Sequence, residues 1–234
     1  MVKLVEAEEN QLTINRFLWM QKYKTQIFIV IGICITILGS PFSLIIRKLI
    51  NTNDVNANYF FGQEGGFVMV YEKFQVGLDF NITMSINPLS TSGLLIGIQG
   101  PQDSLILEMF NNTIIFNVDN GGGAISTIYV PEKNYSMANK KWYNIKAVKS
   151  KNVVLISIDD TFTSPGIGVP GISYTDTNTG FFIGGHPEIE KLRHLQSKKS
   201  HFHGCIKDIV IQGKPLTQEI GIMHGDIKMQ GCLF

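Results

Sequence analysis

The chain has three cysteines, and whether they are paired or free distinguishes an oxidising from a reducing compartment. Cys34 lies in an apolar run near the start, whereas Cys205 and Cys232 both lie near the end. In an oxidising compartment the last two would be expected to pair across 27 positions, from 205 to 232. Closing such a loop stabilises a fold by roughly 3–4 kcal/mol in the chain-entropy model. The alternative is two separate buried thiols.

Metal binding by cysteine and histidine is disfavoured at this end of the chain. His201 and His203 alternate just before Cys205, so on a strand both rings would point to one face. A zinc site normally adds a second closely spaced cysteine, as in Cys-x-x-Cys, and none is present. We therefore expect these imidazoles to contact solvent.

Acid residues suited to hydrolysis are also poorly placed. A glycosidase needs two carboxyl groups at a fixed separation across the scissile bond. Glu108 is isolated in an apolar run, and Asp159 and Asp160 are adjacent, so they would point to opposite faces of a strand. Neither Gly-x-Ser-x-Gly nor His-Glu-x-x-His occurs in the sequence. The residues favour a protein that is not an enzyme.

The overall composition is that of a folded, nearly neutral protein. The 234 residues include 20 Lys and Arg against 19 Asp and Glu, which gives a formal net charge of +1. Such a balance offers no case for nucleic-acid binding. A hydrophobic content of 44% argues against disorder. The chain is long enough for one sizeable domain and an additional segment.

Residues 27–46 differ from the rest of the chain, because these 20 positions hold no charge. That length lets a helix cross a hydrocarbon core of about 30 Å. More basic residues precede the run than follow it, so the C-terminal part would face outward, as in a signal anchor. A signal sequence or a misread gene start are the alternatives. We expect a tail over 1–26 and a linker over 47–58.

The remainder, residues 59–234, has the pattern of an all-β domain. Short apolar runs alternate with turn signals such as NPLSTSG and DNGGG. In DFNITMSI the apolar residues Phe80, Ile82, Met84 and Ile86 fall on one face. No sustained helical period appears in this part of the sequence. Strands at this spacing predict a two-sheet antiparallel β-sandwich of the jelly-roll, concanavalin-like type, preceded by one hydrophobic helix.

Three Asn-x-Ser/Thr sequons fall in this predicted domain, at Asn81, Asn111 and Asn134. Asn81 is on the polar side of its strand, Asn111 is in a tight turn, and Asn134 is in a loop. Each could carry a glycan without burying it. The motif is short, so a chance occurrence is the alternative at each position.

The C-terminal sequence FHGCIKDIVIQGKPL, followed by QGCLF, resembles the signature of laminin G-like domains. GFFIGGHP, KKWYNIKAVKSKNVVLISID and GLLIGIQGPQDSLILEMFNNTIIFNVDNGGG are similar to further elements of that family, in the family's order. The resemblance covers 59–234 and is greatest to the C-terminal G domains of laminin α chains. Tyr143 stands where the family often has His, and Asp160 where it usually has Gly.

The resemblance implies a Ca²⁺ site at one edge of the sandwich. Asp103 and Asp176 match the two acids of the family, and Asn120 and Tyr174 match the residues that supply main-chain carbonyls. Oxygen ligands of this kind suit a hard cation, and two carboxylates imply modest affinity, about 10⁻⁴–10⁻³ M. The alternative is that both acids are ordinary turn residues, which would leave a structural spacer with a degenerate site.

A basic segment precedes the C-terminal signature, with Lys191, Arg193, Lys198 and Lys199 close together. It could bind sulfated or uronic-acid glycans, such as heparin and heparan sulfate, although a solvated charged loop is the alternative. The resemblance implies an extracellular adhesion module of the matrix or the cell surface. Its partners would be such glycans or an α-dystroglycan-like or integrin-like receptor.

Overall fold

The computed structural model describes residues 56–197, 200–218 and 220–232, all within Asp54–Phe234. The expected tail and hydrophobic helix, residues 1–46, lie outside this part, as does most of the expected linker. The described strands are β1 (Asn58–Phe74), β2 (Asp79–Pro88), β3 (Gly93–Gln99), β4 (Ser104–Phe110), β5 (Thr113–Asp119), β6 (Ala124–Tyr129), β7 (Tyr143–Ser150), β8 (Val153–Ile158), β9 (Thr161–Phe162), β10 (Gly166–Ile167), β11 (Thr179–Ile183), β12 (Gly204–Ile211), β13 (Lys214–Pro215) and β14 (Ile222–Met229).

One short 3₁₀ helix, η1 (Ile189–Lys191), accompanies these strands. Among the residues with a described structure, no helix is long and apolar enough to cross a membrane. The predicted all-β class is therefore confirmed for the body of the chain.

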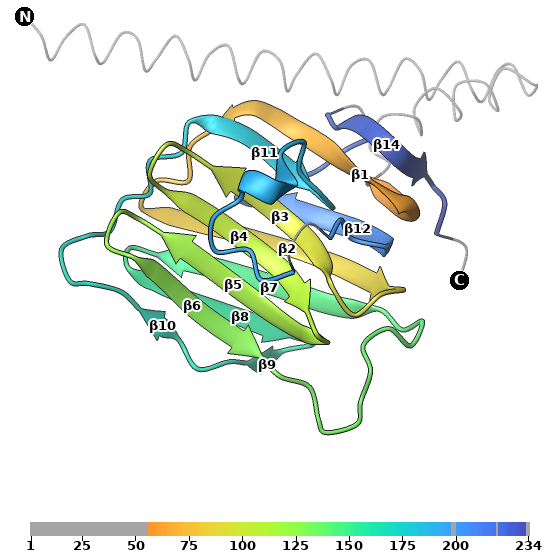
Figure 1. Cartoon of the computed structure of the whole chain (residues 1–234), viewed down its shortest axis with the longest axis horizontal. Coiled ribbons are helices and arrows are strands. Elements are labelled where there is room, and N and C mark those ends of the chain that lie inside the picture. Colours follow the sequence, from red (N-terminus) through yellow and green to blue (C-terminus); the bar gives the residue numbers. More distant parts are fainter. Residues whose placement is uncertain (1–55, 198–199, 219, 233–234) are drawn as a thin grey trace, which may run out of the picture. The chain divides into compact units, whose positions relative to one another are not determined.

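The strands form an antiparallel sandwich whose two layers share β1. Hydrogen-bonded neighbours follow the order β10-β8-β7-β2-β12-β1-β11-β3-β4-β5-β6. The first part of β1 pairs with β12, with Tyr59 opposite Ile206, and a later part pairs with β11, with Met69 opposite Phe182. Figure 1 shows the two layers, with β3 to β6 in one and β2, β7 and β8 in the other. The predicted β-sandwich is thus confirmed.

The period-two pattern of β2 places its apolar side chains between the layers. Phe80, Ile82, Met84 and Ile86 are each at most 2% exposed, while the intervening Asn81 is exposed. Alternate residues of a strand point to opposite faces, so one set enters the core and the other faces outward. The expected orientation of this strand is confirmed.

Strands β3 and β4 read as continuous apolar runs because their outer face is covered too. Leu94 and Ile106 pack there against Ile189 and Leu192, which belong to η1 and the residue after it. Sheets that are buried on both faces lose the alternation of polar and apolar residues. Residues 189–197, named the covering segment below, thus account for the composition of these two strands.

Glu108 of β4 fastens this covering segment to the sheet. Its side chain is fully buried, and its carboxylate accepts hydrogen bonds from the N–H groups of Gln196 (2.8 Å) and Ser197 (2.7 Å). Burial raises the pKa of Glu108, and these two hydrogen bonds oppose the rise. The isolated acid of the sequence is therefore a structural anchor between β4 and the segment that covers it.

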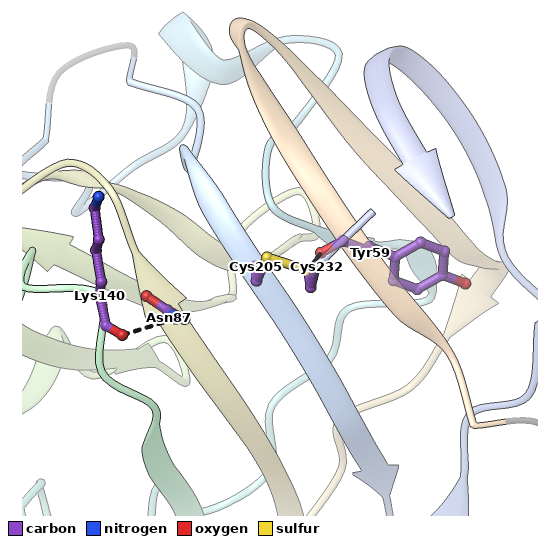
Figure 2. The surroundings of a disulfide bond; sticks show 5 residues. All are labelled: Tyr59, Asn87, Lys140, Cys205 and Cys232. Carbon is purple, nitrogen blue, oxygen red and sulfur yellow. Dashed lines mark hydrogen bonds between the residues drawn. A yellow bond between two sulfur atoms is a disulfide. The ribbon is translucent and has the colours of Figure 1, made fainter. Parts of the chain in front are cut away.

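The expected disulfide is present and fastens the last strand. Cys205 on β12 is bonded to Cys232, which follows β14 (S–S 2.08 Å), and Figure 2 shows the bond beside Tyr59 of β1. β12 and β14 both pair with the beginning of β1. Opposite Cys205 on β2 lies Asn87, whose Nδ2 donates to the Lys140 carbonyl (3.3 Å), as Figure 2 also shows. The disulfide therefore ties both neighbours of β1 together.

Replacing both Cys205 and Cys232 by Ser should lower the free energy of unfolding by about 3–4 kcal/mol, because the unfolded chain regains the entropy of the open loop. Urea denaturation of the oxidised protein measures this difference. Reduction of the wild type should reproduce it, and Cys34→Ser provides the control. A loss below about 1 kcal/mol would mean that the bond contributes little to folding.

Candidate metal centre

Asp103 provides a buried carboxylate between two loops at one end of the sandwich. It lies in the turn from β3 to β4 and is 7% exposed. Its Oδ2 accepts a hydrogen bond from the N–H of Asp176 at 2.6 Å. Its Oδ1 lies beside Gly121, where an added Cβ would be 3.6 Å away. The carboxylate thus connects the loop after β5 with the loop before β11.

The loop after β5 is fastened to the same neighbourhood. Asn120 is 5% exposed, and its Nδ2 donates to the Ile172 carbonyl at 2.7 Å. The Asp119 carboxylate accepts the N–H of Gly121 at 2.9 Å. The structure therefore brings the Asn120 loop next to the residues that precede Asp176.

Tyr174 is placed less directly. Its side chain is 53% exposed, and its ring lies on the side of Gly77. Its predicted ligand is the main-chain carbonyl, and both neighbours are fixed, since Lys149 binds the Ser173 carbonyl and Thr175 pairs with Gly77. Of the four predicted ligands, Asp103, Asp176 and the Asn120 loop are brought together, and Tyr174 adjoins them only through its own loop.

The chemistry of this donor set fits a calcium ion better than a transition metal. In the described part of the chain, no group of three or more His, Cys, Asp or Glu side chains is arranged to hold a metal. We call this end of the sandwich, where the loops of Asp103, Asn120 and Asp176 meet, the rim. It offers two carboxylates, Asp103 and the exposed Asp176, with main-chain oxygens nearby. All are hard oxygen donors, which suit Ca²⁺ when water completes the shell.

Arg193 supports the Asp103 turn from the covering segment. Its guanidinium donates to the carbonyls of Pro101 (2.8 Å), Gly100 (3.1 Å) and Asp103 (3.1 Å). Its own N–H donates to Gln99 Oε1 at 2.6 Å. The planar fork of arginine suits such simultaneous contacts. Arg193, predicted from the sequence to bind glycans, is thus engaged with the main chain of the turn.

Comparison with known proteins identifies the family. The laminin G domain model matches residues 86–214. This chain belongs to the laminin G domain family. It is 31% identical over 182 residues to the laminin subunit alpha of Drosophila melanogaster, and 30% identical over 181 residues to mouse laminin subunit alpha-1. These alignments cover 77% and 74% of this chain but only 5% and 6% of the relatives.

Solved structures agree on the fold. Domains LG4-5 of the mouse laminin alpha1 chain superpose with a TM-score of 0.67 at 24% identity, covering 77% of this chain and 47% of that one. The LG1-3 region of the laminin alpha2 chain gives 0.62 at 20% identity, covering 76% and 34%. At these identities the likeness shows a shared laminin G sandwich.

Lys149 of this laminin G domain is a supporting residue that the sequence analysis missed. It is fully buried, and its Nζ donates to the carbonyls of Gly77 (2.8 Å), Leu78 (2.7 Å) and Ser173 (2.8 Å). It therefore holds the loop that carries Asp176 against the turn between β1 and β2. Burial lowers the pKa of Lys149 to about 8.

A signal for Lys149 does exist in the sequence. In YNIKAVKS the inward positions of β7 are Tyr143, Ile145, Ala147 and then Lys149, all of them buried. A lysine in the inward phase of an amphipathic strand must find acceptors inside the protein. The pattern could therefore have marked this residue, although not the carbonyls that it binds.

The remaining members of the predicted glycan-binding set are not gathered at one point. Lys191 is exposed and pairs with Glu188 at 2.5 Å. Lys198 and Lys199 lie outside the described residues. Within the same segment, His194 Nε2 lies 2.9 Å from Asp119 Oδ2, which links the covering segment to the end of β5.

The three predicted glycosylation sites are all exposed. Asn81 lies on the outer face of β2, and its Nδ2 donates to Gln212 Oε1 at 3.0 Å. The sequons at Asn111 and Asn134 lie near each other, because Asn112 Nδ2 donates to the Tyr135 carbonyl. Accessibility satisfies a requirement for glycosylation at each site, and the modification stays a prediction.

Lys149→Met should destabilise the domain by roughly 1–3 kcal/mol at pH 7, because buried carbonyls lose a charged donor. Since the folded protein loses the Lys149 proton near pH 8 and the unfolded chain near 10.5, the wild type should gain stability relative to the variant over that interval. Urea denaturation at several pH values tests both effects.

Lys146→Met is the matched control for this experiment, because Lys146 is exposed on the same strand. It should change the free energy of unfolding by less than about 0.5 kcal/mol. Equal effects of the two substitutions would show that the buried contacts of Lys149 do not stabilise the loop.

Proposed function

We propose that this laminin G domain is an extracellular binding module that docks anionic glycans, or a receptor that carries them, at a calcium-supported rim. Asp103, Asp176 and main-chain oxygens of the neighbouring loops, including those at Asn120 and Tyr174, would hold the ion. A bound Ca²⁺ would supply positive charge for sulfate or carboxylate groups. Heparan sulfate and an α-dystroglycan-like or integrin-like receptor are the partners of suitable chemistry.

The environment of Asp103 is the observation that carries this proposal. The residue is only 7% exposed, and its carboxylate accepts a hydrogen bond from the Asp176 N–H. Across the described residues, no lysine, arginine or histidine forms an ion pair with it. Buried charges in proteins are normally paired or coordinate metals. A cation beside Asp103 would meet this requirement.

The predicted N-glycans at Asn111 and Asn134 would leave the rim accessible. Asp103 precedes β4, whereas Asn111 follows it, so these residues lie at opposite ends of the same strand. Asn134 lies on the Asn111 side through the contact between Asn112 and Tyr135. Glycans on this end would keep other molecules away from it and direct binding toward the rim.

Glu108 and Asp159, two of the acids considered for hydrolysis, have structural partners, which favours a binding role over an enzymatic one. Glu108 is buried under two main-chain N–H groups. Asp159 Oδ1 accepts hydrogen bonds from the N–H and the side chain of Asn144, at 2.8 and 3.2 Å. A general acid and base need access to a substrate.

The apolar N-terminal run, as a membrane anchor or signal sequence, would place the module outside the cell.

A thermal melt of the full chain with and without about 5 mM Ca²⁺ tests the rim. If Kd is near 10⁻⁴ M, the ion should stabilise the fold by about 2 kcal/mol and raise Tm by several degrees. Asp103→Ala and Asp176→Ala should each abolish the rise, while Asp160→Ala, an exposed acid elsewhere, should keep it. The absence of a rise in the wild type would leave both acids as turn residues of a structural spacer.

Heparin retention tests the basic segment separately. Joint substitution of Lys191, Lys198 and Lys199 by Ala should lower the salt concentration that elutes the protein from heparin, because it removes three positive charges whose attraction to sulfate groups is screened by salt. The calcium-dependent rise in Tm should remain. A triple control at Lys133, Lys146 and Lys151 should have little effect, and equal losses in both variants would refute a localised site.

A further inference from the structure

A pocket of about 290 Å³ lies away from the rim. Asp176 precedes β11 and His186 follows it, so the rim and this pocket lie at opposite ends of that strand. We name it the histidine pocket, after the side chains that line it together with neighbouring glycines: Glu64, Phe67, His186, Glu190, His201 and His224. None of these residues takes part in the proposed calcium site.

The chain makes space for the His201 ring by means of glycine. A Cβ on Gly185 would lie 2.1 Å from His201 Nδ1, and one on Gly65 would lie 3.0 Å from Cδ2. Gly65 also has a φ of +81°, which side chains rarely adopt. The imidazole is therefore held between β1 and the residues that follow β11, which gives it a defined orientation.

Main-chain contacts set opposite tautomers on two of the imidazoles. His201 Nδ1 lies 3.1 Å from the Gly66 carbonyl, which can only accept, so Nδ1 carries a proton and, in the neutral ring, Nε2 is an acceptor. His186 Nδ1 accepts the N–H of Glu188 at 3.0 Å, so its proton is on Nε2, a donor. Burial lowers the pKa of His186, which favours the neutral form of that ring.

The other lining groups narrow the chemistry of a ligand. Glu64 and Glu190 add carboxylate acceptors, and among the described lining residues there is no lysine or arginine to balance them. An anionic ligand would therefore be repelled. Phe67, which stacks on His224 with ring centroids 4.7 Å apart, contributes apolar surface. The pocket thus combines hydrogen-bond acceptors, imidazole donors and an aromatic wall.

We propose that the histidine pocket binds one neutral hexose unit of a glycan. Neighbouring sugar hydroxyls both donate and accept, which matches the acceptor Nε2 of His201 and the donor Nε2–H of His186. The carboxylates accept further hydroxyls, and the C–H face of a sugar packs on apolar and aromatic groups. A volume of about 290 Å³ is at the lower limit of ligand pockets and suits a single ring.

Nuclear magnetic resonance on the full chain, produced without N-linked glycans and kept in EDTA at neutral pH, tests this site. Long-range ¹H–¹⁵N spectra should show the Nδ1–H tautomer for His201 and the Nε2–H tautomer for His186. Methyl galactoside, methyl glucoside and methyl mannoside are then titrated to about 50 mM, since an isolated sugar should bind with a millimolar Kd. At least one should shift the signals of Gly65, Gly66, His186 and His201, and glucuronate should not.

The joint variant Glu64→Ala and Glu190→Ala should lose this response, while Glu72→Ala, an exposed acid of β1 outside the pocket, should retain it. His201→Phe keeps a ring between the two glycines but removes Nε2, and it should also lose the response. Absence of shifts with all three hexosides, or shifts that persist in the pocket variants, would mean that the histidines only stabilise the fold. EDTA makes either result independent of calcium at the rim.

Discussion

The hydrogen bond from the Asp176 N–H to the buried Asp103 carboxylate is the contact on which the rim depends. It joins a turn between two adjacent strands to a loop that arrives from a distant part of the sequence. Arg193 binds the carbonyls of the Asp103 turn, and Lys149 binds the loop before Asp176. Two cationic side chains thus bind main-chain oxygens on either side while the carboxylate itself stays without an ion pair among the described residues.

The covering segment connects stability with the rim. Leu192 belongs to the apolar contact that buries the outer face of β3 and β4, and the next residue, Arg193, reaches the Asp103 turn. Glu108 fixes the later part of the segment through two main-chain N–H groups. Because these contacts share one short stretch of chain, the packing that completes the sandwich also positions the rim.

The two candidate sites use different chemistry at opposite ends of β11. The rim offers carboxylates to a cation, whereas the histidine pocket combines imidazole and carboxylate groups with an aromatic wall, and its described lining residues include no lysine or arginine. A laminin G domain with both could hold an anionic and a neutral part of one glycan, or two ligands at once. Function on this fold resides in such local sites, because the sandwich itself is common to many binding proteins.

The sequence by itself determined the sandwich class and most of the longer strands, because period-two alternation and turn residues are local properties. It favoured the pair Cys205–Cys232 over two separate thiols, and the structure contains that bond. The resemblance to laminin G domains added the prediction that Asp103 and Asp176 are ligands of a calcium ion. Only the tertiary structure showed that Arg193 and Lys149 bind main-chain carbonyls, and that His186 and His201 line one pocket. Those contacts join residues far apart in the chain, and no local pattern encodes which distant carbonyl a side chain will meet.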